Sequence, residues 1–207
     1  MDPLEFRVMI SPMKKLLQRF FEFKMFKQLL TSRQVDLTKK KILEVGCGAG
    51  YGLELISNEF NPKKLVAFDI IPKLIVIAKQ YTEQKSIPVK LFVGDILDID
   101  LPSNEFDCVF CFTVLHHVPK WRQALKELNR VLKPNGVLLI DDHTKRSLDR
   151  LERFFKVKHS KDARFQWSEF KKEIINAGFK IIQEKKFTFG IGLNFLMSVK
   201  TKNIPLR

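Results

Sequence analysis

Short apolar runs alternate with amphipathic stretches along most of the chain from Lys41 onward. The runs typical of buried strands cover residues 41–45, 64–69, 89–93, 106–112 and 136–141, and helical periodicity covers 51–59, 72–83, 121–132 and 167–179. Strands that alternate with helices predict a mostly parallel sheet with helices on both faces. Two final apolar runs, 179–189 and 193–200, have no helix between them, so we expect an antiparallel pair at one edge. The pattern predicts a doubly wound α/β fold with seven strands.

Prolines, glycines and a serine indicate where the predicted helices begin and end. Pro72 and Pro119 open two of them, because proline suits the first helical position. The third helix stops at the sequence KPNG, residues 133–136. In the last helix we expect Ser168 as the N-terminal cap and Gly178 as the C-terminal cap.

The first segment, residues 11–30, is basic and strongly apolar and has helical periodicity. Its apolar stripe is wider than a simple surface helix needs. One face carries Leu16, Phe20, Phe23 and Leu30, and a second carries Leu17, Phe21, Met25 and Leu29. Packing on the domain is the favoured interpretation, and covering an apolar substrate or lying on a membrane surface are the alternatives.

Residues 43–52 read LEVGCGAGYG, where four glycines follow the first predicted strand. Glycine at this density disfavours helix and strand and lets a ligand touch bare backbone. In a parallel sheet this loop lies at the carboxyl edge, where ligands bind, and the next helix offers free N–H groups. The dinucleotide fingerprint G-x-G-x-x-G fails in every register, because its third glycine would fall on Tyr51, Leu53 or Leu55.

The series Glu44-x-Gly46-x-Gly48-x-Gly50 resembles the first motif of class I S-adenosylmethionine-dependent methyltransferases. The resemblance continues in order through AFDI, GDI, FDCVFCFTVLHHV and RVLKPNGVLLI, over roughly residues 41–142. It implies a Rossmann-like fold, S-adenosyl-L-methionine as the cofactor and methyl transfer as the reaction. We therefore expect an N-terminal helical cap segment over residues 1–40 and a cofactor-binding domain over 41–207, together forming a single domain.

The resemblance also implies roles for individual residues near the cofactor. Asp69 would bind the ribose hydroxyls, and a carboxylate can accept from both of them. Asp95 would accept from the adenine amino group while Ile96 packs on the ring. Glu44 would order the loop or reach the cofactor's amino group indirectly. The full set of expected cofactor contacts is Glu44, Gly46, Gly48, Asp69, Ile70, Asp95, Ile96 and Phe112.

Three histidines near the expected cofactor edge are candidate catalytic residues. His116 and His117 follow the fourth predicted strand, and Asp141, Asp142 and His143 follow the fifth. Histidine is the natural base near neutral pH, and a base is needed only when the acceptor is protonated. A role of the histidine pair in fold and cofactor packing is the alternative. A metal cluster of these side chains is a further one, but their spacing is not diagnostic and we assign no metal.

Charge is distributed unevenly along the chain. The net charge of +14 combines +6 over residues 1–41, −2 over 42–144 and +10 over 145–207. An anionic partner would explain this excess, and so would a lysine-rich solvated surface. The same two interpretations apply to the basic segment KVKHSKDARFQW, in which His159, Lys161 and Arg164 could contact an anionic substrate group.

Cysteine usage and apolar content bear on the compartment. Cys47, Cys108 and Cys111 are odd in number and do not form a disulfide framework, so buried thiols are favoured over a metal or redox pair. No apolar run reaches the length of a membrane span, and the N-terminus lacks the order of a secretory signal. We expect a cytoplasmic protein.

The motifs after the fourth and fifth strands are most similar to those of methyltransferases of quinone biosynthesis and related metabolites. We therefore expect a small-molecule acceptor, lipophilic or anionic, and an in-line displacement that depends on alignment and exclusion of water. Methylation of RNA or protein is the alternative. Against nucleic acid, the sequence CFTVL stands where amino-methylating enzymes carry an Asn/Asp-Pro-Pro-aromatic motif. A non-catalytic, cofactor-binding regulator is the further alternative.

Overall fold

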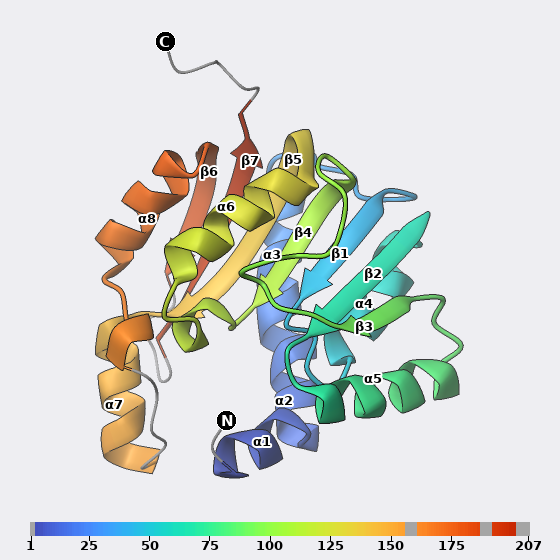
Figure 1. Cartoon of the computed structure of the whole chain (residues 1–207), viewed down its shortest axis with the longest axis horizontal. Coiled ribbons are helices and arrows are strands. Elements are labelled where there is room, and N and C mark those ends of the chain that lie inside the picture. The colour runs from blue at the N-terminus through green and yellow to red at the C-terminus, as the bar shows by residue number, and fades with distance from the viewer. Residues whose placement is uncertain (1–2, 156–160, 187–191, 202–207) are drawn as a thin grey trace.

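The protein is a three-layer α/β structure built around one sheet. The computed structural model describes residues 3–155, 161–186 and 192–201. In Figure 1, α6 and α8 lie in front of the sheet and α3 and α4 lie behind it. The strands are β1 (Lys41–Val45), β2 (Lys64–Asp69), β3 (Lys90–Val93), β4 (Phe106–Phe112), β5 (Leu132–His143), β6 (Phe179–Lys186) and β7 (Leu193–Lys200).

The helices cover both faces of the sheet and its carboxyl edge. The α-helices are α1 (Pro3–Met9), α2 (Pro12–Leu17), α3 (Phe23–Thr31), α4 (Tyr51–Phe60), α5 (Pro72–Gln84), α6 (Trp121–Val131), α7 (Lys145–Phe155) and α8 (Trp167–Asn176). A π-helical turn, η1 (Gln18–Glu22), joins α2 to α3, and two 3₁₀ turns are η2 (Leu115–His117) and η3 (Lys161–Ala163). None of the described helices is both long and apolar enough to cross a membrane.

The sheet has the order β3-β2-β1-β4-β5-β7-β6. β1 to β5 run parallel to one another, whereas β7 pairs antiparallel with both β5 and β6. The predicted Rossmann-like, mostly parallel sheet with an antiparallel C-terminal pair is therefore confirmed. The carboxyl ends of the parallel strands meet at the lower edge in Figure 1, where α1, α2 and α5 also lie.

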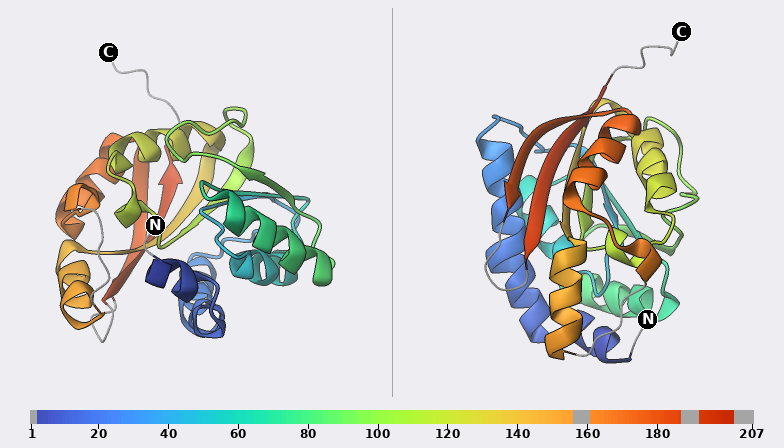
Figure 2. Two further views of the ribbon diagram at one scale, coloured as in Figure 1. Left: turned by 60° about the horizontal axis from the view of Figure 1, so that its bottom comes forward. Right: turned by 90° about the vertical axis from the view of Figure 1, so that its left-hand side faces the viewer.

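Alternating side chains of the strands feed two separate hydrophobic cores. One core joins the sheet to α6 and α8 and includes Trp121 and Phe170. The other joins it to α3, α4 and α5 and includes Phe26 and Phe110. The edge-on view in Figure 2 shows the sheet between these two helical layers. Cys108 and Cys111 are buried and free and belong to opposite cores, which confirms buried thiols and separates the two sulfur atoms.

The predicted ends of two helices are wrong in detail. α6 ends at Val131, and β5 begins at Leu132, so the KPNG sequence lies inside the strand rather than before it. α8 begins at Trp167 with Gln166 as its N-cap, which leaves Ser168 within the first turn. Its C-cap is Ala177, and Gly178 follows with φ +88°, the left-handed conformation that glycine adopts without a steric penalty. Residues 187–189 of the last but one predicted strand lie outside the described residues.

The N-terminal segment is longer and less buried than its periodicity predicts. A continuous helical stretch runs through α2, η1 and α3, and α1 precedes it. Phe23 and Leu30 are buried, but Leu16 and Phe20 of the same predicted face are 55% and 65% exposed. The reason is that α3 lies against the sheet, whereas α2 extends past it toward the carboxyl edge (Figure 2). Sequence analysis also missed α7, which continues the chain directly after β5.

The packing of α3 leads to a stability prediction. Phe26 is fully buried, and its ring lies 5.9, 5.1 and 5.6 Å from the rings of Phe110, Phe112 and Phe195. Phe26→Ala should lower the free energy of unfolding by about 3–5 kcal/mol, because it opens a cavity among these rings. The matched variant Phe20→Ala, at an exposed position six residues earlier, should change it by about 0.5 kcal/mol or less. Denaturant unfolding measures both, and equal losses would contradict this packing.

Candidate active site

The glycine loop between β1 and α4 forms a cradle of bare backbone. Gly46 has φ +65°, and a Cβ atom there would lie 2.5 Å from Cγ2 of Val114. Gly48 has φ +54°, and its Cβ would lie 3.0 Å from Cε of Met9. Both positions combine a left-handed backbone with a lack of room, so a side chain is excluded at Gly46 and strained at Gly48. The loop is therefore built for close approach, as the sequence predicts.

Asp69 ties the end of β2 to this loop. Its Oδ2 accepts a hydrogen bond from the backbone N–H of Gly48 at 2.9 Å, and its Oδ1 accepts from that of Ile71 at 2.9 Å. Burial raises the pKa of the Asp69 carboxyl, against the lowering effect of these N–H donors. Each oxygen keeps a second lone pair, so the carboxylate can still accept from the hydroxyls of a ribose.

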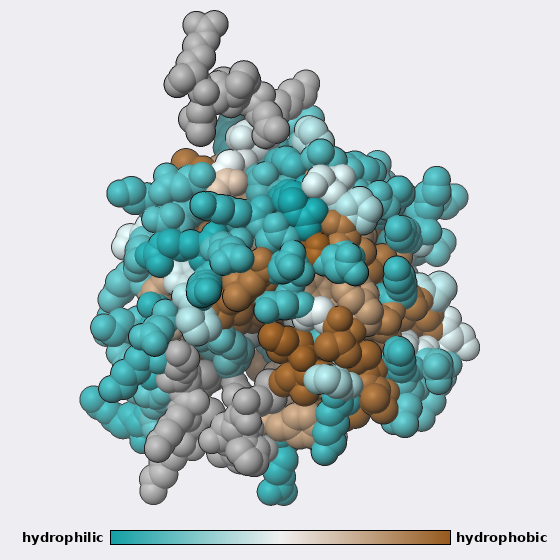
Figure 3. Space-filling model, in the orientation of Figure 1, coloured by the Kyte–Doolittle hydropathy of each residue, from teal (hydrophilic) through white to brown (hydrophobic). Residues whose placement is uncertain are grey.

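The apolar side chains near the predicted adenine position differ in how far they are exposed. Ile70 and Val93, at the ends of β2 and β3, are 62% and 50% exposed, and Figure 3 shows hydrophobic residues gathered on the lower part of the face toward this edge. Ile96 is instead buried in the core shared with α6. Asp95 is half-buried and accepts from the N–H of Leu97 at 2.9 Å, which leaves further lone pairs for an exocyclic amine.

Glu44 and Phe112 lie beneath the loop on the face covered by α3 and α4. Phe112 is buried, with its ring 5.6 Å from that of Phe110. Glu44 is 1% exposed, and Oε1 occupies the space next to the backbone of Gly52. Desolvation raises the pKa of the Glu44 carboxyl well above its ordinary value, and Oε2 has no hydrogen-bond partner among the described residues.

The three histidines predicted as candidates lie together at the carboxyl edge. The rings of His116 and His117 are 3.8 Å apart, and those of His116 and His143 are 5.2 Å apart. His116 is buried, with Nδ1 2.6 Å from Oδ1 of Asp142, whereas His117 is exposed and His143 is half-buried. The group therefore consists of one fixed histidine, one exposed histidine and one half-buried histidine.

The adjacent residues Asp141 and Asp142 serve opposite faces of β5. Asp142 accepts from the N–H groups of Leu115 at 2.7 Å and His143 at 2.7 Å, and desolvation raises its pKa to about 6. Asp141 points to the other face and is fully buried, and neither of its oxygens has a hydrogen-bond partner among the described residues. Among those residues, no cluster of three or more His, Cys, Asp or Glu could hold a metal ion.

The structure brings residues from the N-terminal segment to the loop, which sequence analysis missed. Met9, Lys14 and Gln18 line a cavity of about 20 Å³ together with Gly46, Gly48 and Phe112. The hydroxyl of Tyr51 donates to the carbonyl of Ile10 at 2.9 Å and fixes the segment to the start of α4. A basic, apolar helix gives no sequence signal for this position, because its partners are tens of residues away along the chain.

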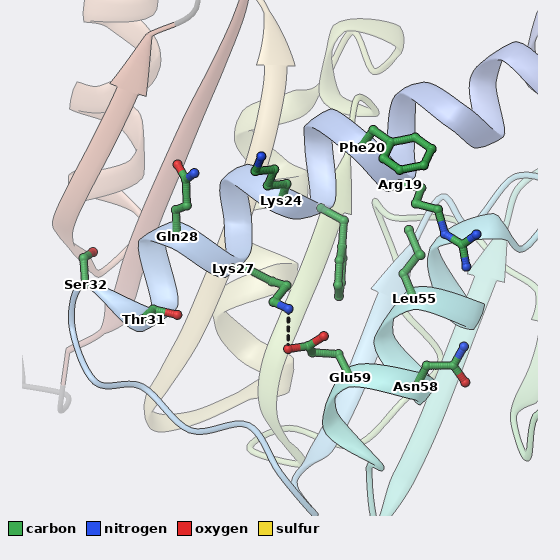
Figure 4. A pocket seen from close by; sticks show the side chains of 11 residues that line it. Arg19, Phe20, Lys24, Lys27, Gln28, Thr31, Ser32, Leu55, Asn58 and Glu59 are labelled. Carbon is green, nitrogen blue, oxygen red and sulfur yellow. Dashed lines mark ion pairs between the residues drawn. The ribbon is translucent and has the colours of Figure 1, made fainter.

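A larger groove, of about 910 Å³, lies away from the glycine loop between α3 and α4. Figure 4 shows Phe20 and Leu55 flanking it, with Arg19, Lys24 and Lys27 projecting along it and Nζ of Lys27 2.7 Å from Oε1 of Glu59. None of the predicted site residues lines this groove.

One basic residue of the segment after α7 lies in ion pairs, rather than in a solvated loop or at a substrate. Arg164 is 8% exposed and forms ion pairs with Asp149 and Glu152 of α7. It therefore fastens α7 to η3 and is not offered to an anionic substrate. His159 lies outside the described residues.

Known proteins resemble this chain in sequence and in fold. Residues 43–140 match the model of a methyltransferase domain. The fatty-acid O-methyltransferase of Mycolicibacterium smegmatis (strain ATCC 700084 / mc(2)155) is 30% identical over 112 residues, which are 54% of this chain and 40% of that enzyme. The tRNA N(3)-methylcytidine methyltransferase trm140 of Schizosaccharomyces pombe (strain 972 / ATCC 24843) is 29% identical over 176 residues, with 76% and 57% covered. The chain thus spans about half the length of these relatives.

Among solved structures, a S-adenosylmethionine-dependent methyltransferase from Aquifex aeolicus superimposes with a TM-score of 0.73 at 22% identity and covers 96% of this chain and 98% of that one. These matches support the assignment of the chain to the class I S-adenosylmethionine-dependent methyltransferases. Its glycine cradle, its buried carboxyl groups and its exposed apolar residues at the strand ends fit the family's cofactor, S-adenosyl-L-methionine. In this methyltransferase, the loop and Asp69 would hold the nucleoside, and the histidine group lies one strand away, since β4 pairs with β1.

Asp69→Asn tests the ribose contact. It should raise the Kd for S-adenosylmethionine about ten- to a hundredfold, because a hydrogen bond to a charged group contributes about 1.5–3 kcal/mol. Folding should suffer little. Because the pKa of Asp69 is raised in the folded protein, ionisation of this carboxyl lowers the stability as pH rises through that pKa. A neutral asparagine avoids this cost, which offsets the loss of one hydrogen-bond acceptor.

Calorimetry and thermal unfolding measure the two effects of this variant. Asp100→Asn, at an exposed position after β3, is the matched control and should leave both quantities unchanged. An unchanged Kd in Asp69→Asn would refute the ribose assignment.

Proposed function

We propose that this methyltransferase acts on an oxygen atom of a small lipophilic molecule, with His117 or His143 as the proton acceptor. The observation that carries the proposal is the histidine group, in which a buried His116–Asp142 pair supports an exposed His117 ring at 3.8 Å. An outward-facing imidazole at the carboxyl edge is suited to take a proton from an acceptor hydroxyl.

Apart from this proton transfer, the reaction requires mainly that the acceptor oxygen be aligned with the methyl group of the cofactor. The bound cofactor supplies a methyl group on a positively charged sulfur. The acceptor oxygen would take this methyl group and give its proton to a ring nitrogen of His117 or His143, and the methyl donor would leave as S-adenosylhomocysteine. The chain contributes position and exclusion of water, which lower the barrier without a covalent enzyme intermediate.

Apolar surface beside the glycine loop supports a lipophilic acceptor. Val8 and Met13, which lie one residue before and four residues after Met9, are 51% and 78% exposed. Exposed apolar side chains next to a site favour an apolar ligand over a fully hydrated one. The similarity to a fatty-acid O-methyltransferase points to the same class of acceptor.

Transfer of labelled methyl groups tests this function. The protein is incubated with methyl-labelled S-adenosylmethionine and separate lipid, small polar metabolite, RNA and protein fractions. Label in the lipid fraction, released by alkaline hydrolysis if the product is an ester and retained if it is an ether, is the expected result. Label in RNA or protein, with none in lipid, would refute the proposed acceptor class.

His117→Gln should lower kcat for a hydroxyl acceptor by about 10²- to 10⁴-fold while the Kd for S-adenosylmethionine changes less than about twofold, because a base acts only in the chemical step. His143→Gln is the matched variant from the facing strand end, and comparing the two shows which ring accepts the proton. If both variants retain full kcat across the pH range, neither histidine is the base.

Methylation of RNA is the second candidate, favoured by the net charge of +14 and by the similarity to a tRNA methyltransferase. The ion pairs of the described residues weigh against it, because they neutralise basic side chains on several elements. Examples are Lys41 and Lys64 with Glu105, and Lys133 with Asp107. RNA binding whose affinity falls steeply with salt, together with methyl transfer to RNA, would favour this second candidate.

A further inference from the structure

Four ionisable side chains, three of them buried carboxyl groups and the fourth the 15% exposed Lys14, lie together where the N-terminal segment meets the sheet. Nζ of Lys14 lies 2.8 and 3.1 Å from the two carboxylate oxygens of Glu22, and 3.3 Å from Oγ1 of Thr113. Glu22 is 1% exposed, and Asp141 and Glu44 lie near enough to act electrostatically on Lys14. A largely buried lysine needs such carboxyl groups to remain charged.

The cluster contains more acidic than basic groups. Three carboxyl groups face one ammonium, and those of Asp141 and Glu44 have their pKa raised well above the ordinary value, chiefly by burial. Both oxygens of Asp141 and Oε2 of Glu44 have no hydrogen-bond partner in the described part of the chain. Buried polar atoms are almost always satisfied, so these atoms indicate a ligand with hydrogen-bond donors and a charge of its own.

The cluster adjoins the cofactor cradle directly. Lys14 lines the same small cavity as Gly46, Gly48 and Phe112. The backbone N–H of Thr113, which follows Phe112, donates to the carbonyl of Asp141 at 2.9 Å. A zwitterionic amino-acid group placed there would meet an ammonium on one side and carboxyl groups on the other, which is the complementary arrangement.

We propose that Lys14 binds the α-carboxylate of the amino-acid end of S-adenosylmethionine, exchanging part of its contact with Glu22 for the ligand. The proposal rests on the cofactor and does not depend on which acceptor is methylated. It makes the N-terminal segment, which lies outside the family's motifs, a wall of the cofactor site.

The same geometry requires the segment to move. A cavity of about 20 Å³ has room for about one water molecule, whereas the amino-acid end contains several carbon, nitrogen and oxygen atoms. Met9 fills the space over Gly48. Met9 and the segment that carries it therefore have to shift outward when the cofactor enters.

Decarboxylated S-adenosylmethionine provides the test, because it keeps the sulfonium and the amine and lacks only the carboxylate. Calorimetry measures the Kd of both ligands, without acceptor, for the unmodified protein, Lys14→Met, the double variant Lys14→Met/Glu22→Gln, and Lys24→Met. The double variant removes the uncompensated buried charge that Lys14→Met alone leaves on Glu22. Lys24→Met is the matched control on the exposed side of α3.

The unmodified protein and Lys24→Met should bind S-adenosylmethionine at least tenfold more tightly than the decarboxylated form. In both Lys14 variants this ratio should fall to within about twofold of one. A ratio that stays above tenfold in the double variant, or an equal loss of affinity for both ligands, would overturn the proposal. If the unmodified protein binds neither ligand, the cofactor assignment itself fails, and the role of Lys14 fails with it.

Discussion

The contact between Phe26 and three phenylalanine rings of the sheet determines where the N-terminal helices lie relative to the glycine loop. Phe110 and Phe112 belong to β4 and Phe195 to β7, so one side chain of α3 bridges the parallel and antiparallel parts of the sheet. Because α3 is fixed in this way, the continuous helix carries α2 past the carboxyl edge and places Met9 and Lys14 at the glycine loop. The core and the site are therefore coupled through a helix that the family's motifs do not include.

Adjacent residues of a strand face opposite sides of the sheet, and at the carboxyl edge this places two neighbouring carboxyl groups of β5 in different chemical environments. Asp142 faces the histidines and receives backbone N–H donors, whereas Asp141, the residue before it, faces Lys14 and Glu22. One strand thus supplies a carboxylate to the group proposed for proton transfer and another to the group proposed for cofactor binding. A change in the register of β5 by one residue would exchange the two and disrupt both.

Local patterns were sufficient to predict the sheet and most of the cofactor loop. The strands around Leu43, Val66 and Val109 are continuous apolar runs, and the alternation of glycines at 46, 48 and 50 reports directly on backbone geometry. The failures have physical causes of another kind. Whether Phe20 is buried depends on where the sheet ends beneath the helix, and Lys14 meets Thr113 across 99 positions of sequence. No periodicity within one segment contains that information. The extent of β5 was missed because a turn-like KPNG sequence can also continue a strand at the edge of its pairing.

The π-helical turn η1 sets the directions in which side chains before and after it point from the long N-terminal helix. In this turn the N–H of Phe23 reaches back to the carbonyl of Gln18, one residue further than in an α-helix. Such a turn contains an extra residue, and each residue of a helix rotates the following side chains by about 100°. Lys14 before η1 and Gln18 at its first position can therefore point at the glycine loop while the half of the helix after η1 points Phe26 at the sheet. In evolution, gain or loss of one residue within η1 could re-aim the cofactor-facing side chains without altering a single core contact of α3.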